Sequence, residues 1–255
     1  MLKATGHRES KIMSKLIRLD KFLSEMKKGT RKEIKEAVKR GRITVNGDIV
    51  KNADLKINPD TDTVCFDNAA VKFARYEYFI MNKPQGVISA TKDEQEQTVI
   101  DLIQDNVRSD LFPVGRLDKD TEGLLLITNN GDLAHRLLSP SRHVKKIYYA
   151  KIEGIVTEDD KLKFSKGITL SDGTITKPAS LKILVSAPIS EIELTIYEGK
   201  YHQVKRMFAA CGKHVLYLKR ICMGNLYLDK ELKTGEYRQL TENELDLLCG
   251  DWRQQ

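Results

Sequence analysis

The sequence lacks the features of a membrane, secreted or metal-binding protein. None of its apolar runs approaches the roughly 18 residues of a membrane-spanning helix. Residues 1–15 are polar and basic and contain no apolar segment of the kind found in secretory signals. Its cysteines show neither Cys-x-x-Cys spacing nor histidine partners at ligand spacing: Cys65, Cys211, Cys222 and Cys249. We therefore expect a cytoplasmic protein with reduced cysteines, no membrane partner and no metal site.

Glycine-rich phosphate-binding strings are missing as well. Neither Gly-x-Gly-x-x-Gly nor a Walker A string occurs, so the sequence gives no support for a nucleotide cofactor, and we expect no cofactor of any kind. What is present suffices for a globular protein. At 255 residues and 40% apolar content, the chain can form one large domain, or a large and a small one.

Positive charge is concentrated at one end of the chain. Residues 1–60 contain 16 Lys and Arg against 8 Asp and Glu, a net charge of +8, whereas residues 61–255 contain 27 against 28, a net charge of −1. Such an asymmetry indicates a polyanion-binding module joined to a domain of another kind. We therefore expect two domains.

The basic module has a recognisable pattern. Apolar residues recur at helical spacing from residue 18 until Gly29, and a capping box at residues 30–33 opens a second helix that stops at Gly41. Residues 42–50 predict a hairpin, because Asn-Gly at its centre is typical of a type I′ turn. Two short helices followed by a hairpin resemble the S4 RNA-binding domain over residues 17–63.

The resemblance to the S4 domain gives its cations a role. It implies that eight of them bind RNA: Arg18, Lys21, Arg31, Lys32, Lys35, Lys39, Arg40 and Arg42. The alternative is an ordinary solvated helix face, which is the usual fate of a charge run. We favour RNA binding because the excess charge is concentrated and of one sign, as contact with phosphates requires.

The rest of the chain predicts a larger α+β domain. A flexible extension is expected over residues 1–16, a linker over 64–75 and the second domain over 76–250. Strands are predicted from residue 76, from residue 146 and from residue 192, the last with clean alternation of apolar and polar residues. Shorter helical patterns occur at 98–104, 132–138 and in the segment that ends at Gly212. Many strands with few helices indicate a mixed, mainly antiparallel sheet.

One polar loop in this domain stands out. Residues 113–123 (Pro-Val-Gly-Arg-Leu-Asp-Lys-Asp-Thr-Glu-Gly) lead directly into an apolar run at 124–127, which reads as a buried strand. Polar loops mounted on rigid elements commonly carry chemistry. Considered alone, however, acids beside an arginine could form a solvated ion-pair loop.

The complete sequence string around this loop favours a catalytic loop over a solvated ion-pair loop. Gly-Arg-Leu-Asp-x-x-Thr-x-Gly-Leu-Leu resembles the catalytic loop of the pseudouridine synthases that modify ribosomal RNA. One further string of that family precedes this loop and four follow it in order, so that the resemblance covers residues 78–245. They are Asn82-Lys83-Pro84-x-Gly86, Lys146-Ile147-Tyr148, Glu198 to Phe208, Leu218-x-Arg220, and Gly235-x-Tyr237-Arg238-x-Leu240-Thr241.

The resemblance implies residue roles. It makes Asp118 the catalytic carboxylate, Tyr148 a platform for the target base, and Arg116 the residue that fills the vacated stack or holds a flanking phosphate. The third motif supplies basic residues near Asp118, so Lys205 and Arg206 are expected at the substrate. Gln203 and Lys83 complete the expected substrate-binding set.

The resemblance is strongest to the branch acting on small-subunit (16S) ribosomal RNA. We expect a monomer that binds ribosomal RNA or the assembling small subunit and flips one uridine out of its stack. Three other readings stay open: a synthase acting on 23S RNA, a non-catalytic RNA-binding assembly factor, and a hydrolase that pairs Asp118 with Asp120 or Glu122. The last is weak, because neighbouring loop residues hardly provide the separation that a glycosidase-like carboxylate pair needs.

Overall fold

The computed structural model describes residues 16–249. The described chain forms two compact units, one of residues 16–75 with 106–110, the other of residues 76–105 with 111–249. Apart from Leu16, the extension predicted over residues 1–16 lies outside the described residues. No helix in the described part is both long and apolar enough to cross a bilayer.

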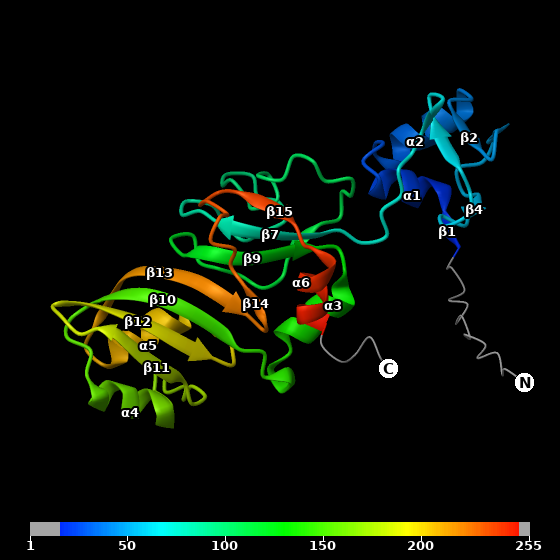
Figure 1. Ribbon diagram of the computed structural model, residues 1–255. Coiled ribbons are helices and arrows are strands. Elements are labelled where there is room, and N and C mark those ends of the chain that lie inside the picture. Colours follow the sequence, from blue (N-terminus) through cyan, green and yellow to red (C-terminus); the bar gives the residue numbers. More distant parts are fainter. Residues whose placement is uncertain (1–15, 250–255) are drawn as a thin grey trace, which may run out of the picture. The chain divides into compact units, whose positions relative to one another are not determined.

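Unit 1 contains two helices and six short strands (Figure 1). In chain order they are β1 (Ile17–Arg18), α1 (Leu19–Glu25), α2 (Arg31–Lys39), β2 (Ile43–Val45), β3 (Asp48–Ile49), β4 (Lys56–Ile57), β5 (Val64–Phe66) and β6 (Ala69–Ala70). Its core is formed by the apolar sides of both helices and of β2, including Phe22, Leu23, Ile34 and Ile43. Burial of these faces leaves the charged side of α2 exposed.

Two local predictions in unit 1 are confirmed. Thr30 caps α2: its hydroxyl accepts a hydrogen bond from the Glu33 amide, and the Glu33 carboxylate accepts one from the Thr30 amide. In the predicted hairpin, β2 pairs with β3 across Asn46 (φ 54°) and Gly47 (φ 92°), the left-handed conformations of a type I′ turn.

The linker predicted over residues 64–75 is wrong in its first half. Strand β5 pairs with β2, and β6 pairs with β5, so residues 64–70 complete the four-stranded sheet of unit 1. The physical reason is that β5 pairs with β2, which places Val64 in the core, and a second tight turn at Asp67 (φ 50°) and Asn68 (φ 64°) leads from β5 into β6. An Asp-Asn pair between two short apolar segments carried this signal in the sequence.

Unit 2 is built on a nine-stranded sheet in which only the β13–β9 pair is parallel. The main order is β11-β12-β10-β13-β9-β7-β15, with β14 added to β13 and β8 to β9. The predicted α+β class with a mixed, mainly antiparallel sheet is therefore confirmed. The strands are β7 (Tyr78–Lys83), β8 (Phe112–Pro113), β9 (Glu122–Thr128), β10 (Lys146–Glu153), β11 (Ser180–Val185), β12 (Ile189–Ile196), β13 (His214–Met223), β14 (Leu226–Tyr227) and β15 (Tyr237–Gln239).

Strand β9 is buried on both faces, which explains its unbroken apolar run. Leu125 and Ile127 belong to one hydrophobic core, whereas Leu124 and Leu126 belong to another on the opposite face. Successive side chains of a strand point to opposite faces, so a central strand covered on both sides needs apolar residues at every position. The polar loop before it therefore starts from a rigid element.

Helices cover both faces of this sheet (Figure 1). Apolar residues of two helices join the first core and those of two others the second core. The first pair is α4 (Glu158–Lys166) and α5 (Gln203–Ala210), and the second is α3 (Gly131–Leu138) and α6 (Glu242–Cys249), with a 3₁₀ turn η1 (Pro140–Arg142) after α3. The helix predicted over 98–104 is wrong: Thr98 and Asp101 form a capping arrangement, but the chain makes only a turn there.

Candidate active site

A pocket of about 610 Å³ in unit 2 contains the polar loop. Most of its lining comes from the loop between β8 and β9, the turn at residues 199–204 that leads into α5, and one face of strands β10 and β13. Ile88, Ser89, Leu138 and Ile196 complete it. Among the described residues that line this pocket, Asp118 is the sole carboxylate.

The loop is held by its main chain. The Ser89 hydroxyl donates to the Leu117 carbonyl and accepts from the Leu117 amide, both at 3.0 Å. The Thr121 amide donates to the Asp118 carbonyl at 3.0 Å, which closes a tight turn. Because Leu117 and Thr121 are both buried, Asp118 is fixed between two anchored residues.

Lys83 binds the main chain of the same loop, which differs from its expected role at the substrate. Its side chain is fully buried, and its ammonium donates to the carbonyls of Asp118 (3.1 Å) and Thr121 (3.0 Å). Further contacts reach Pro84 O at 2.9 Å and Lys119 O at 3.4 Å. Burial lowers the pKa of Lys83 to about 8, and nearby acids oppose the shift. Its geometry is that of a residue that positions the loop.

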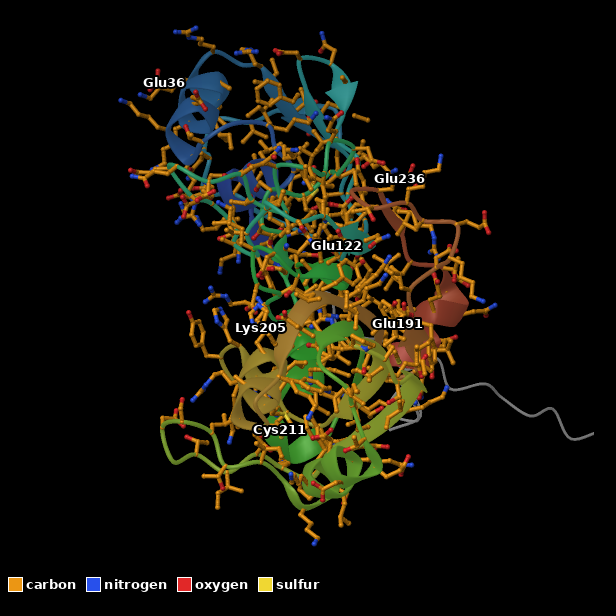
Figure 2. The ribbon with its side chains drawn as sticks, turned by 90° about the vertical axis from the view of Figure 1, so that its left-hand side faces the viewer. Glu36, Glu122, Glu191, Lys205, Cys211 and Glu236 are labelled. Atoms are coloured by element: carbon orange, nitrogen blue, oxygen red, sulfur yellow. The ribbon has the colours of Figure 1, made fainter. Side chains whose placement is uncertain are left out.

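The Asp118 carboxylate has two cationic or potentially cationic neighbours, both from α5 or its first turn. His202 Nε2 lies 3.5 Å from Oδ1, and Lys205 Nζ lies 3.6 Å from Oδ2. Lys205 projects from near the N-terminal end of α5 (Figure 2). The third string of the resemblance is therefore brought to Asp118, although the two segments are far apart in the sequence.

The closest partner of Lys205 is Asp120, a contact that sequence reasoning did not anticipate. Lys205 Nζ lies 2.5 Å and 2.7 Å from the two Asp120 oxygens. This hydrogen bond is the main reason that the pKa of Asp120 lies below its usual value. The next acid along the chain is also occupied, because Glu122 accepts a hydrogen bond from the Tyr217 hydroxyl at 2.7 Å.

Tyr148 and Arg116 both line the pocket that contains Asp118. Tyr148, on β10, is only 8% exposed and lines the pocket. Arg116 also lines it but is exposed, and it has no ion pair or hydrogen bond to any described residue. The aromatic ring inside the pocket could stack on a flipped base. The unpaired guanidinium at the surface could contact the RNA strand that the base has left.

Gln203 and Arg206 both form polar contacts with other residues of the protein. Gln203 is buried, donates to Glu198 and accepts from the Lys200 amide, both at 2.9 Å, which shapes the turn into α5. Arg206 lies 2.6 Å from Asp172 and is not among the residues lining the pocket. Both were expected at the substrate; Gln203 also lines the pocket, whereas Arg206 does not.

Two buried cations of the pocket were not singled out as functional from the sequence. Lys146 and Arg220 are 7% and 2% exposed, and both line the pocket. The signal was present: each occupies a position where strand alternation predicts an inward side chain, and each belongs to a string shared with the family. A charged residue at an inward position is unusual enough to mark a site.

The eight cations of unit 1 that were expected to bind RNA divide into two groups. Arg18 bonds to Asp20 at 2.7 Å, Arg42 to Asp67 through Nε at 2.7 Å, Lys21 lies 3.6 Å from Glu25, and Lys39 lies 2.8 Å from Glu36. The other four form no ion pair with any described residue and are exposed: Arg31, Lys32, Lys35 and Arg40. These four lie on α2 or directly after it. We call them the α2 cations.

No metal-binding cluster is assembled in the described chain. Within residues 16–249, no three His, Cys, Asp or Glu side chains come together in a way that could hold a metal ion. Cys65, Cys211 and Cys222 are free thiols.

Comparison with known families gives a separate match for each of the two units. The profile of the RNA pseudouridylate synthase family matches residues 77–210. The profile of the S4 domain matches residues 17–62. The first range covers most of unit 2 up to the end of α5, and the second lies within unit 1.

Individual relatives cover nearly the whole chain. An RNA pseudouridine synthase of Bacillus subtilis (strain 168) is 47% identical over 91% of this chain and 98% of its own length. Ribosomal small subunit pseudouridine synthase A of Escherichia coli (strain K12) is 40% identical over 90% of this chain and 98% of its own. A crystal structure of a pseudouridylate synthase matches with a TM-score of 0.64 at 38% identity, covering 91% of this chain and 99% of that one.

Proposed function

The chain belongs to the RNA pseudouridylate synthase family and carries an S4 domain, and we propose that it isomerises a specific uridine of 16S ribosomal RNA with Asp118 as the catalytic carboxylate. The E. coli relative, named for the small ribosomal subunit, supports this choice of substrate over 23S RNA. The reaction takes place in the cytoplasm, on ribosomal RNA or the assembling small subunit.

The observation that carries the proposal is the position of Asp118. It is the carboxylate of a pocket that also contains the aromatic ring of Tyr148. Pseudouridine formation breaks the N1–C1′ bond, turns the base and joins C5 to C1′, with no net oxidation and no hydrolysis. It requires one ionised carboxylate at the junction of sugar and base. Asp118 can attack the ribose, attack the base, or remove a sugar proton.

Base flipping gives Tyr148 and Arg116 their roles. Taking a base out of its stack costs a few kcal/mol, and stacking on an aromatic ring recovers part of that free energy. Tyr148 offers such a ring inside the pocket, and Arg116 is free to fill the vacated position or to bind a flanking phosphate.

A hydrolase that pairs Asp118 with a neighbouring acid fits the site less well. Asp120 is held by Lys205, and Glu122 by Tyr217. Neither acid lines the pocket. A two-carboxylate mechanism needs both acids to face one substrate. Release of free uracil from RNA would support this second function.

Tritium release tests the proposal directly. In RNA containing 5-tritiated uridine, joining C5 to C1′ releases the tritium into water, whereas binding alone releases none. We expect release from 16S RNA or a small-subunit assembly particle with the wild-type protein, and none with Asp118→Asn. Release from 23S RNA alone would move the proposed target, and binding without any release would indicate an assembly factor.

A further inference from the structure

Two positive charges lie buried in the pocket without an acidic partner. The Lys146 ammonium donates to the Val144 carbonyl at 3.1 Å. The Arg220 guanidinium donates through Nε to the Leu124 carbonyl at 2.8 Å, and its buried Nη2 has no hydrogen-bond partner. Neither side chain forms an ion pair with a described carboxylate.

Such an arrangement is costly in a free protein. Buried charges are normally paired, because removing them from water costs several kcal/mol per ion unless an opposite charge compensates. The pKa of Lys146 is lowered to about 8, first by burial and then by the charge of Arg220. A negative charge arriving in the pocket would therefore be attracted by both groups.

A local irregularity of the sheet brings these groups together. Lys146 and Tyr148 alternate along β10 and share its buried face. The pairing of β10 with β13 shifts register between Ile147 and Tyr148 of β10, so Tyr148 lies opposite Arg220 of β13. An unbroken ladder would place Ile221 there and turn Arg220 to the other face. Bulges beside active sites commonly redirect a side chain in this way. We call Lys146 and Arg220 the cationic floor.

We propose that the cationic floor binds the carbonyl oxygens of the flipped uracil and takes up the negative charge that the base acquires during the reaction. This inference rests on the function proposed above. The floor shares its strand face with Tyr148, the expected stacking platform, so a base on that ring would have its polar edge within reach of cations. Fixed charges aimed at a developing anion are the strongest common source of catalysis.

The electron count is the same in each route open to Asp118. If the carboxylate attacks C1′, an O–C1′ bond forms and the N1–C1′ electron pair leaves with the base. If it removes the C2′ proton, the C–H pair forms a C1′=C2′ bond and the N1–C1′ pair again leaves with the base. If it attacks C6, an O–C6 bond forms, the C5=C6 pair forms a C4=C5 bond, and the C4=O4 pair moves onto O4. In every case a uracil carbonyl oxygen becomes more negative.

A phosphate is the other anion that RNA could bring to this floor. The exposed Arg116 is better placed for that role, because both floor cations are buried beneath the pocket surface whereas the phosphate backbone stays outside when a base enters. If the floor bound phosphate, its loss would weaken RNA affinity and reduce the salt dependence of binding.

The test measures rate and affinity separately in the full-length protein. Lys146→Met should lower the single-turnover rate at saturating RNA by about 10²- to 10³-fold while changing Kd by less than about threefold. Lys146→Arg, which keeps the charge, should recover at least part of that rate. Lys145→Met removes the same charge one residue away, outside the pocket, and should match wild type. Arg220→Lys should be more active than Arg220→Met, which also covers the case in which one Lys146 variant folds poorly.

A better leaving group provides a readout that a structural defect would not change. Fluorine at C5 stabilises the uracil anion, so RNA with 5-fluorouridine at the target should depend less on the floor. We expect Lys146→Met to slow loss of 5-fluorouridine, measured in nuclease digests, by only about tenfold or less, since electrostatic help is then needed less.

The outcomes separate this inference from the function it rests on. A wild-type protein that releases no tritium from any ribosomal RNA would overturn both. An active wild type with Lys146→Met and Arg220→Met equally active would overturn the floor alone. Equal losses with uridine and 5-fluorouridine, or a loss confined to Kd and its salt dependence, would also overturn it and indicate a structural or phosphate-binding role.

Discussion

Asp118 and Asp120 are separated by one residue, yet their carboxylates have different neighbours. Asp118 is held through its main chain and leaves its side chain in the pocket, with Lys205 at 3.6 Å and His202 at 3.5 Å. Asp120 is exposed and holds Lys205 at 2.5 Å. One cation therefore serves two acids, and the closer acid is the one outside the pocket.

This difference predicts unequal effects of the same substitution. Asp118→Asn should lower the single-turnover rate by about 10⁴-fold or more, because within residues 16–249 no other carboxylate lines the pocket. Asp120→Asn should change the rate by less than about tenfold, because exposed ion pairs contribute little. Tritium release at saturating RNA measures both. If Asp120→Asn were as inactive as Asp118→Asn, the assignment of roles within this loop would be wrong.

Lys205 is expected to act through the balance of charge in this group. Lys205→Met leaves Asp118 and Asp120 without their shared cation, so the rate should fall by roughly 10- to 100-fold, a rise in activation free energy of about 1.4–2.7 kcal/mol. Adding Asp120→Asn removes the uncompensated acid and should restore part of the rate. A double-mutant cycle on single-turnover rates measures this coupling. Strictly additive losses would show that Lys205 acts on the substrate and not through Asp120.

At the scale of elements, β7 is joined to the loop before β9 by hydrogen bonds. Lys83 ends β7 and donates to the loop carbonyls, and β9 follows the loop directly. Gly123 at the start of β9 allows a close approach, because a Cβ there would lie 2.2 Å from the Arg220 carbonyl. The glycine of the loop string is therefore needed where β9 meets β13, and it also brings the Arg220 main chain against the loop.

Lys83 should leave a signature in the pH dependence of stability. Its folded pKa of about 8 lies below the usual 10.5, so between these values the unfolded chain holds a proton that the folded protein has released. The contribution of Lys83 to the free energy of unfolding therefore rises with pH through this window. Lys83→Met should lose that rise, and should be less stable at pH 7 by about 3 kcal/mol because buried carbonyls lose their donor.

Denaturant unfolding of both proteins from pH 7 to pH 9.5 measures the effect. Lys146, whose pKa is also about 8, is present in both and cancels in the difference. A stability difference that stays constant with pH would contradict the depressed pKa of Lys83.

The elements that the sequence predicted well are those with strong local signals. The capping box of α2, the Asn46-Gly47 hairpin and the doubly buried β9 each follow from chemistry within a few residues. The errors arose where short segments depend on distant partners: β5 forms a strand because β2 is available to pair with it, and residues 98–104 have a helix cap but no helix to follow.

The candidate site also contains features that the sequence indicated and features that it did not. Asp118, Arg116 and Tyr148 line one pocket, as the resemblance implied. The contacts of Lys205 with Asp120 and of Lys83 with loop carbonyls depend on three-dimensional proximity that no spacing in the sequence encodes. The cationic floor depends on a register shift between β10 and β13, which periodicity cannot predict because a bulge breaks the period.

At the scale of the whole molecule, charge and chemistry lie in different units. The candidate active site is contained in unit 2, whereas residues 16–60, which belong to unit 1, contain 12 Lys and Arg against 7 Asp and Glu, a net charge of +5. In unit 1 the α2 cations are exposed and unpaired among the described residues, while Arg18 and Arg42 are committed to acids. Affinity for RNA should therefore depend on unit 1 far more than the rate of the chemical step does.

Neutralising the α2 cations tests this division. Each lost phosphate contact should reduce the log–log salt slope of binding by about 0.7–0.9, so a variant with Gln at all four positions should lose up to about 3 in slope. The rate of tritium release at saturating RNA should stay within about threefold of wild type, because uniform binding affects affinity and not the chemical step. A matched control replaces four lysines of unit 2 that pair with acids and do not line the pocket: Lys151, Lys161, Lys163 and Lys182. It changes the net charge equally, so a similar loss of slope in both variants would mean that overall charge, and not the α2 surface, binds the RNA.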